Sequence, residues 1–441
     1  MGQVPLPSDV KPTCVVSEAD FAKWFQSGSV SPGGAVLPAD SVNFPLDNTN
    51  CDFYKWSWQM FLWMNSPTDT GAGIVFDGAE FYDVSPGGSS GKRVLLPNTK
   101  VDSFLTRTRK TGVIKNGVPT DETGQAGGGG TLMAQSGSLL YYGLHVNNVY
   151  AYFLTGQKTG ALTQTTFPTT AADLAAINKY AGFTLPDGQA LSLELKTSWV
   201  EAETLESIGL DSSQYVLVQG SIPTYAKTDT TWTPSGTTTT TMALVGMHIV
   251  GSVQGHPEMI WASFEHINNC PANSYDYTTT SGATGTVPYN SDGRWLLTQS
   301  GAMTSGANSE LMNTNSDGVI TAKPGQQIGP SNVYRVFPWG NLGNDAKDNT
   351  DIVSINLSVL SQLPQSDVRS NYVMIGALWN QHGNLPPGGN QIGSKTMANS
   401  TMETFHQDAS MNCFSCHQGT SFGQDDLSHI YFNIVPVIPT K

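Results

Sequence analysis

Alternating apolar and polar residues in the middle of the chain predict β-strands. Residues 191–200 alternate in this way, which is the period-two pattern of a strand with one buried face. Short apolar runs rich in β-branched and aromatic residues predict further strands, and turn residues such as Gly255-His256-Pro257 between them favour antiparallel pairing. These runs cover residues 215–222, 242–250, 259–267 and 372–379, with weaker ones at 139–142 and 149–153.

Helical periodicity is less common. Apolar residues near 3.6-residue spacing predict a helix over residues 52–64, and Ser66-Pro67 ends it. Further helices are expected at 170–180, 352–363 and 395–406, an exposed Thr-rich hairpin at 228–241, and surface loops at 127–130 and 341–351. The pattern predicts a mainly β fold, antiparallel and sandwich-like, with a few helices. A large β-rich domain with an N-terminal helix is expected over residues 1–390, and a short helical segment over 391–441 packs on it.

Composition narrows the classes of function. Only 13% of the 441 residues are charged and the net charge is −14, which argues against a protein that binds nucleic acid or an anionic membrane surface. Apolar residues make up 38% of the chain, enough for a large core. No run approaches the roughly 20 apolar residues of a membrane span.

The strongest chemical signal is Cys413-Phe414-Ser415-Cys416-His417, which matches the C-x-x-C-H signature of covalent haem attachment. Two thiols on one helical turn can form thioethers with the two vinyl groups of one porphyrin. The histidine that follows can then bind the iron. The motif predicts one covalent haem c.

At this motif the chain resembles the c-type cytochromes. The resemblance implies thioether bonds at Cys413 and Cys416, and it implies His417 as the proximal iron ligand. Residues 56–59 and 256–258 look similar to large bacterial cytochrome c-like proteins. The chain departs from small cytochromes c because no methionine follows His417 and because most of the chain precedes the motif.

Two other interpretations of the motif stay open. A zinc site would combine Cys413 and Cys416 with His429 or His406. A redox or structural disulfide would join the two cysteines, although the βαβ pattern around redox C-x-x-C motifs is missing.

The second axial position of the iron decides between electron transfer and catalysis. His429, twelve residues after His417, is the expected sixth ligand, with Gly419 and Gly423 giving the chain freedom to turn back. His406, Met402, Met411 and the hairpin from His256 to His266 are alternatives, as is an open site.

Two further groups of residues are candidates for the haem environment. The histidines and glutamates of residues 247–266 lie on an expected hairpin, where Glu258 and His266 can share a face and act as metal ligands or as an acid–base pair. A buried polar network is the favoured interpretation of this group. The tryptophans of residues 53–64 are expected in the core rather than around the haem. The members of the two groups are His248, His256, Glu258, Glu265 and His266, and Trp56, Trp58 and Trp63.

Haem attachment of this kind implies export, because maturation in the family takes place outside the bacterial inner membrane. We therefore expect a periplasmic or extracellular protein whose leader is absent from this chain. An oxidising compartment permits a disulfide, for which Cys14–Cys51 is the first choice and Cys14–Cys270 and Cys51–Cys270 are alternatives.

Together these features predict an exported c-type haem redox protein, with electron transfer as its expected role. A haem-dependent oxidoreductase, peroxidase- or oxygenase-like, with a substrate pocket in the β domain is the alternative. A zinc-stabilised β-rich binding protein is a further one. The expected partner is a redox protein or a small-molecule substrate, and neither nucleic acid nor a membrane span is expected.

Overall fold

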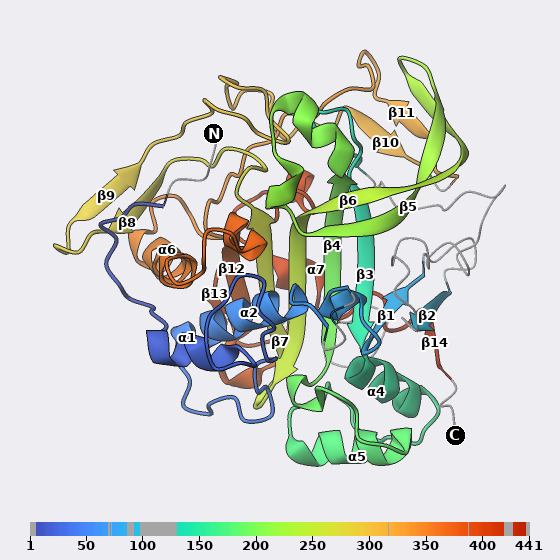
Figure 1. Ribbon diagram of the computed structural model, residues 1–441, viewed down its shortest axis with the longest axis vertical. Coiled ribbons are helices and arrows are strands. Elements are labelled where there is room, and N and C mark those ends of the chain that lie inside the picture. Colours follow the sequence, from blue (N-terminus) through green and yellow to red (C-terminus); the bar gives the residue numbers. More distant parts are fainter. Residues whose placement is uncertain are drawn as a thin grey trace.

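The computed structural model describes residues 6–68, 71, 73–85, 92–97, 130–315, 317–386, 388–418 and 427–437 (Figure 1). Strands make up 29% and helices 23% of the structure, so the predicted mainly β fold is confirmed. In the described ranges the strands form one large sheet and one separate two-stranded sheet, β8 (Tyr275–Thr278) with β9 (Thr284–Val287).

The large sheet is mostly antiparallel. Its main path has the order β13-β12-β7-β6-β4-β3-β1-β2-β14, in which only β14 and β2 are described as a parallel pair. β5 and β11 also pair with β6, and β10 pairs with β11. The bounds are β1 Phe81–Val84, β2 Arg93–Pro97, β3 Tyr141–Asn147, β4 Leu193–Glu201, β5 Leu217–Lys227, β6 Thr231–Val253, β7 His256–His266, β10 Met312–Thr314, β11 Ile320–Ala322, β12 Tyr372–Asn380, β13 Gln391–Gly393 and β14 Ile434–Val435.

Helices cover one face of the sheet, and the C-terminal segment covers the other. Figure 1 shows α2 in front of the strands and α7 behind them. The C-terminal segment also adds β13 and β14 to the sheet, one toward each end of the strand order. The helices are α1 Glu18–Trp24, α2 Asn50–Met64, α4 Asn148–Lys158, α5 Ala171–Ala181, α6 Ala346–Leu360 and α7 Cys413–Cys416, and short 3₁₀ turns include η7 Thr404–His406.

The predicted helix over 52–64 is α2, and its aromatic residues form core. The backbone N–H of Thr49 donates to the Asp52 carboxylate (2.8 Å) and caps its N-terminus. Phe61 stacks on Phe264 of β7 at 4.3 Å between ring centroids. Trp56, Trp58 and Trp63 are all buried, as predicted.

Several of the predicted strands and helices are present in the structure. Strands β4, β5, β6, β7 and β12 and helices α2 and α5 overlap the predicted ranges, and residues 228–241 lie in the β5–β6 hairpin, as expected. Residues 127–129 of the predicted glycine loop lie outside the described residues.

Three predictions of secondary structure were wrong. Residues 149–153 belong to α4 instead of a strand, because the Asn147 side chain caps a helix by accepting from the Tyr150 N–H (3.0 Å). The expected loop at 341–351 already contains the start of α6, where the Asp345 side chain accepts from the Asp348 N–H. Residues 395–403 are not helical, because Asn399 and Thr401 in this segment bond to side chains of the sheet.

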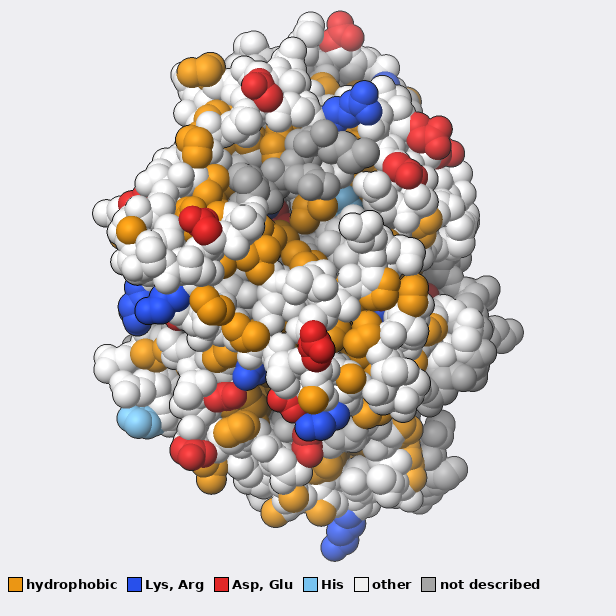
Figure 2. Space-filling model, turned by 60° about the vertical axis from the view of Figure 1, so that its left-hand side comes forward, with side chains coloured by type: hydrophobic (Ala, Val, Ile, Leu, Met, Phe, Trp, Pro, Cys, Tyr) orange, Lys and Arg blue, Asp and Glu red, His pale blue; other side chains and the backbone are white. Residues whose placement is uncertain are grey.

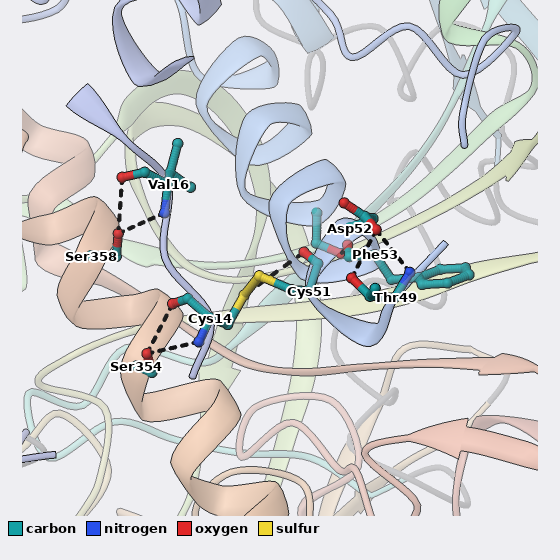
Figure 3. Close-up of a disulfide and its surroundings, with 9 residues drawn as sticks. Cys14, Val16, Thr49, Cys51, Asp52, Phe53, Ser354 and Ser358 are labelled. Atoms are coloured by element: carbon teal, nitrogen blue, oxygen red, sulfur yellow. Dashed lines mark hydrogen bonds between the residues drawn. A yellow bond between two sulfur atoms is a disulfide. The ribbon is translucent and has the colours of Figure 1, made fainter. Parts of the chain in front are cut away.

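The predicted Cys14–Cys51 disulfide is present (Figure 3). It joins the N-terminal segment to α2, while the same segment bonds to α6. Ser354 Oγ accepts from the Cys14 N–H (3.1 Å) and donates to the Cys14 carbonyl (2.9 Å), and Ser358 Oγ accepts from the Val16 N–H (2.9 Å). Cys270, which the alternative pairings would have joined to Cys14 or Cys51, is free and buried.

Replacing Cys14 and Cys51 with serine is expected to lower the free energy of unfolding. The bond joins residues that are 37 positions apart. A cross-link over that length lowers the conformational entropy of the unfolded chain, which stabilises the fold by about 4 kcal/mol. Urea unfolding followed by circular dichroism measures the effect, with Cys270→Ala as the control for losing a cysteine. Equal unfolding midpoints for wild type and the double variant would contradict the expectation.

Charged side chains are sparse on the face of the molecule that Figure 2 shows. Figure 2 shows one face on which acidic and basic side chains stand mostly singly between polar and apolar ones, without a continuous basic area. Among the described residues, no helix combines the length and the apolar character needed to cross a membrane.

Candidate cofactor site

A cavity of about 460 Å³ lies between the sheet and the C-terminal segment. Its volume falls in the range of cofactor and small-ligand pockets, roughly 300–1,000 Å³. The sheet contributes Arg93, Leu144, Glu194, Lys196, His248, Val250, Trp261 and Ala262, and the C-terminal segment contributes Met397, Ala398, Met402, Glu403, His406, Met411, Asn412, Cys413, Cys416, His417, His429 and Ile430.

Strand register places the floor residues side by side. Lys196 of β4 lies opposite Leu144 of β3 on one side and opposite His248 of β6 on the other. Two residues along, Glu194 lies opposite Val250. Because side chains two apart on a strand share a face, these two rows line the same cavity.

The segment over residues 399–401 is fixed to the sheet by polar contacts. Thr401 accepts at its carbonyl from the Tyr142 hydroxyl (2.6 Å), and its own hydroxyl lies 2.6 Å from Ser198 Oγ. Asn399 Nδ2 donates to Ser263 Oγ (3.0 Å). A Cβ on Gly246 would lie 2.5 Å from Thr401 Oγ1, so the glycine permits this close approach. The backbone and side chains of residues 399–401 therefore bind the sheet. The predicted helix over 395–406 was wrong, except that its end forms the 3₁₀ turn η7.

The cysteine motif forms one helical turn at the edge of the cavity. The His417 N–H donates to the Cys413 carbonyl (2.9 Å), which closes the turn, and Phe414 is buried against the Trp261 ring at 6.0 Å. Both thiols line the cavity and are not joined in a disulfide. Burial raises the pKa of the Cys413 thiol. The turn thus presents two neighbouring thiols to one cavity.

His417 is held in a defined tautomer. Its Nδ1 lies 2.7 Å from the Leu427 carbonyl, which can only accept, so Nδ1 carries the proton and Nε2 keeps its lone pair. Burial, together with the charge of His429, lowers the pKa of His417 to about 3. The ring is therefore a neutral imidazole at physiological pH, as a metal ligand must be. Metal-binding histidines commonly donate their second N–H to a backbone carbonyl in this way.

His429 lies beside His417 in the structure. The two rings stack at 3.9 Å with 14° between their planes, and His429 Nε2 donates to the Cys416 carbonyl (3.0 Å). Stacked rings face each other with their π surfaces rather than with their ring nitrogens. For His429 to be the sixth ligand, the ring would have to leave both contacts.

The other expected candidates divide into two groups. His406, Met402 and Met411 line the cavity, as does His248. The remaining histidines and glutamates of β7 belong to separate buried networks and do not line it. His256 pairs with Glu258 (2.8 Å), Glu265 pairs with Arg335, and His266 stacks on Tyr215 at 3.7 Å. The buried polar interactions favoured for this group are therefore present. The alternative, in which Glu258 and His266 share one site, is not, because they lie toward opposite ends of β7.

His248 and Glu403 form a hydrogen-bonded pair inside the cavity. Nε2 of His248 lies 3.0 and 3.1 Å from the two carboxylate oxygens of Glu403. Burial alone would raise the pKa of the Glu403 carboxyl, but the charge and hydrogen bond of His248 and the charge of Lys196 lower it to about 2. Glu403 is therefore ionised at neutral pH.

Glu194 is a second acid on the cavity floor. Burial raises the pKa of Glu194 to about 7, against the opposite effect of hydrogen bonds from Ser428 and Tyr150 and of the charge of Arg93. Glu194, Lys196 and Glu403 were not among the site residues predicted from the sequence. The alternation in residues 191–200 contains a signal for the first two, because both charges fall on one face of an otherwise buried strand.

Comparisons with known proteins returned no match to a family model, a curated protein or a solved structure. Among the described residues, no three His, Cys, Asp or Glu side chains form a group that could hold a metal ion, so the structure does not show a zinc site at the motif.

Proposed function

We propose that this chain is an exported c-type haem redox protein that carries one covalent haem. Cys413 and Cys416 would hold the haem by thioether bonds, and His417 would bind its iron. The observation that carries the proposal is that both thiols and His417 line one cavity of cofactor size. The bond from His417 Nδ1 to the Leu427 carbonyl supports it, because that bond leaves Nε2 unprotonated.

The residues around the motif fit the needs of a redox cofactor. When bound, haem supplies reversible one-electron exchange. Val250, Trp261 and the three methionines Met397, Met402 and Met411 give the cavity apolar walls that limit contact with water. Phe414 packs against Trp261 and holds the attachment turn at the sheet.

The anchoring of the tail supports the same arrangement. Lys158 at the end of α4 donates to the carbonyls of Tyr431, Phe432 and Ile434. The Tyr431 hydroxyl also donates to Gln157 Oε1 (2.8 Å). These bonds fix the chain that follows His429, and with it the Leu427 region that orients His417. The Cys14–Cys51 disulfide supports export, because such bonds persist in oxidising compartments.

A second candidate function is that of a haem-dependent oxidoreductase. It is favoured by the ionisable groups of the cavity floor, His248, Glu403, Glu194 and Lys196. A simple electron carrier has no need of proton-transfer groups beside its cofactor, whereas a catalyst does.

The test is expression of the chain, with an export leader, in a host that carries a c-type haem maturation system. We expect one haem per chain that stays attached through acid–acetone extraction and gives a pyridine haemochrome spectrum of the thioether type. Recovery of folded protein without covalent haem would refute both redox functions and leave the zinc-stabilised alternative.

A further inference from the structure

The two ring nitrogens of His248, which lines the cavity, differ in their hydrogen bonding. The Glu403 carboxylate can only accept, so His248 Nε2 is the donor in their bond, and Nδ1 carries the lone pair in the neutral ring. No described residue forms a hydrogen bond with Nδ1. Glu403 is held in turn by the Asn399 N–H, which donates to Oε2 (3.0 Å). The carboxylate thus orients the ring and leaves one basic nitrogen.

Comparison with two other His–carboxylate pairs shows what is particular to this one. His145 with Asp83 and His256 with Glu258 are sealed in the protein, with side-chain exposures of 0% and 0%, and of 6% and 0%. The side chains of His248 and Glu403 are 16% and 34% exposed, and both line the cavity. The sealed pairs suit a structural role. The open pair can exchange a proton with a molecule in the cavity.

The charges that face His248 are suited to a small anion. Lys196 lies directly across on β4, and Arg93 of β2 also lines the cavity. The acids are Glu194 on the floor and Glu403 above it, and the other histidines are His406, His417 and His429 of the C-terminal segment. A proton gained by His248 would add a second cation beside Lys196, and Glu403 would balance it.

We propose that His248, oriented by Glu403, is the proton acceptor for a small weak acid that binds in this cavity. The inference rests on the proposed haem function and adds a ligand class to the same site. In the step, the H–X bond of the ligand breaks, its electron pair stays on X⁻, and the proton goes to His248 Nδ1. The imidazolium keeps its Nε2–H on the Glu403 carboxylate. The reverse transfer releases HX, so no oxidant or reductant is consumed.

The probe is cyanide, which is present mainly as HCN at neutral pH and binds ferric haem as the anion. Stopped-flow mixing of cyanide with the ferric holoprotein gives the association rate, after haemochrome analysis has established covalent haem. We expect wild type to bind cyanide and His248→Gln to bind it about 100-fold more slowly, in the range of general acid–base effects. Glu403→Gln should lose about tenfold, because it keeps the base but not its orientation and charge.

The matched control is His256→Gln, which removes a histidine from a sealed His–carboxylate pair and should leave the cyanide rate within about twofold. A purely structural role of His248 would not change the pH profile. A proton acceptor at His248 gives the wild-type cyanide rate a pH dependence that His248→Gln should lack. If His248→Gln fails to fold, the cyanide rate and pH profile of Glu403→Gln test the inference instead.

Two results would overturn the inference. One is covalent haem with no cyanide binding in wild type. The other is equal rates and pH profiles in wild type, His248→Gln and Glu403→Gln. Absence of covalent haem would refute the proposed function itself.

Discussion

Replacing both Cys413 and Cys416 with serine is expected to abolish covalent haem completely. Serine keeps the size and the helical turn of the motif, but its hydroxyl does not form the thioether that a thiol forms with a vinyl group. Both sulfurs line the same cavity, so either single variant should keep one bond and a reduced yield. Haem stain after denaturing electrophoresis and acid–acetone extraction measure the result.

Two controls make this outcome specific. Cys270→Ala removes the buried cysteine that lies outside the cavity and should leave the haem yield unchanged. The folded state of the double variant is checked by the Cys14–Cys51 disulfide, which should still form. Haem that survives extraction in the double variant would show that the attachment site lies elsewhere in the chain.

The sequence was informative where the chemistry is local. The spacing of Cys413, Cys416 and His417 is set by one helical turn, and the structure places all three at one cavity. Strands with strict alternation, such as β4, were predicted within two residues because one face of the strand is buried. The Cys14–Cys51 pairing was preferred because both residues lie in the N-terminal region, and the structure contains that bond.

Prediction failed where tertiary contacts outweigh local preference. The residues of α4 have the aromatic and β-branched character of a strand, yet nearly all of them are buried and an asparagine cap starts a helix. Residues 395–403 have helical spacing, but Asn399, Ser400 and Thr401 form hydrogen bonds with side chains of the sheet. The same contacts carry Glu403 to His248, which is 155 residues away in the chain. No local pattern contains a pairing of that length.

Replacing His417 with alanine should leave the haem attached but change its iron ligation. The thioethers do not depend on the histidine, so the haemochrome yield should stay within about twofold of wild type, as for separate sites. Loss of the neutral imidazole removes the nitrogen that the Leu427 carbonyl orients, and both ferric and ferrous absorption spectra should shift. Added imidazole should restore much of the wild-type spectrum, because it can enter the space left by the side chain. A ferrous spectrum identical to wild type would show that His417 is not the ligand.

The matched substitution His429→Ala separates two roles for the neighbouring ring. If His429 were the sixth ligand, wild type would be low-spin, and the variant would become high-spin and bind carbon monoxide rapidly. The stack on His417 and the bond to the Cys416 carbonyl favour the other role, in which His429 supports the proximal ring. We therefore expect wild type to bind carbon monoxide already and His429→Ala to keep its spin state. Resonance Raman spectra of both proteins measure this. Conversion from low-spin to high-spin in the variant would place His429 on the iron and close the cavity to the proton exchange proposed for His248.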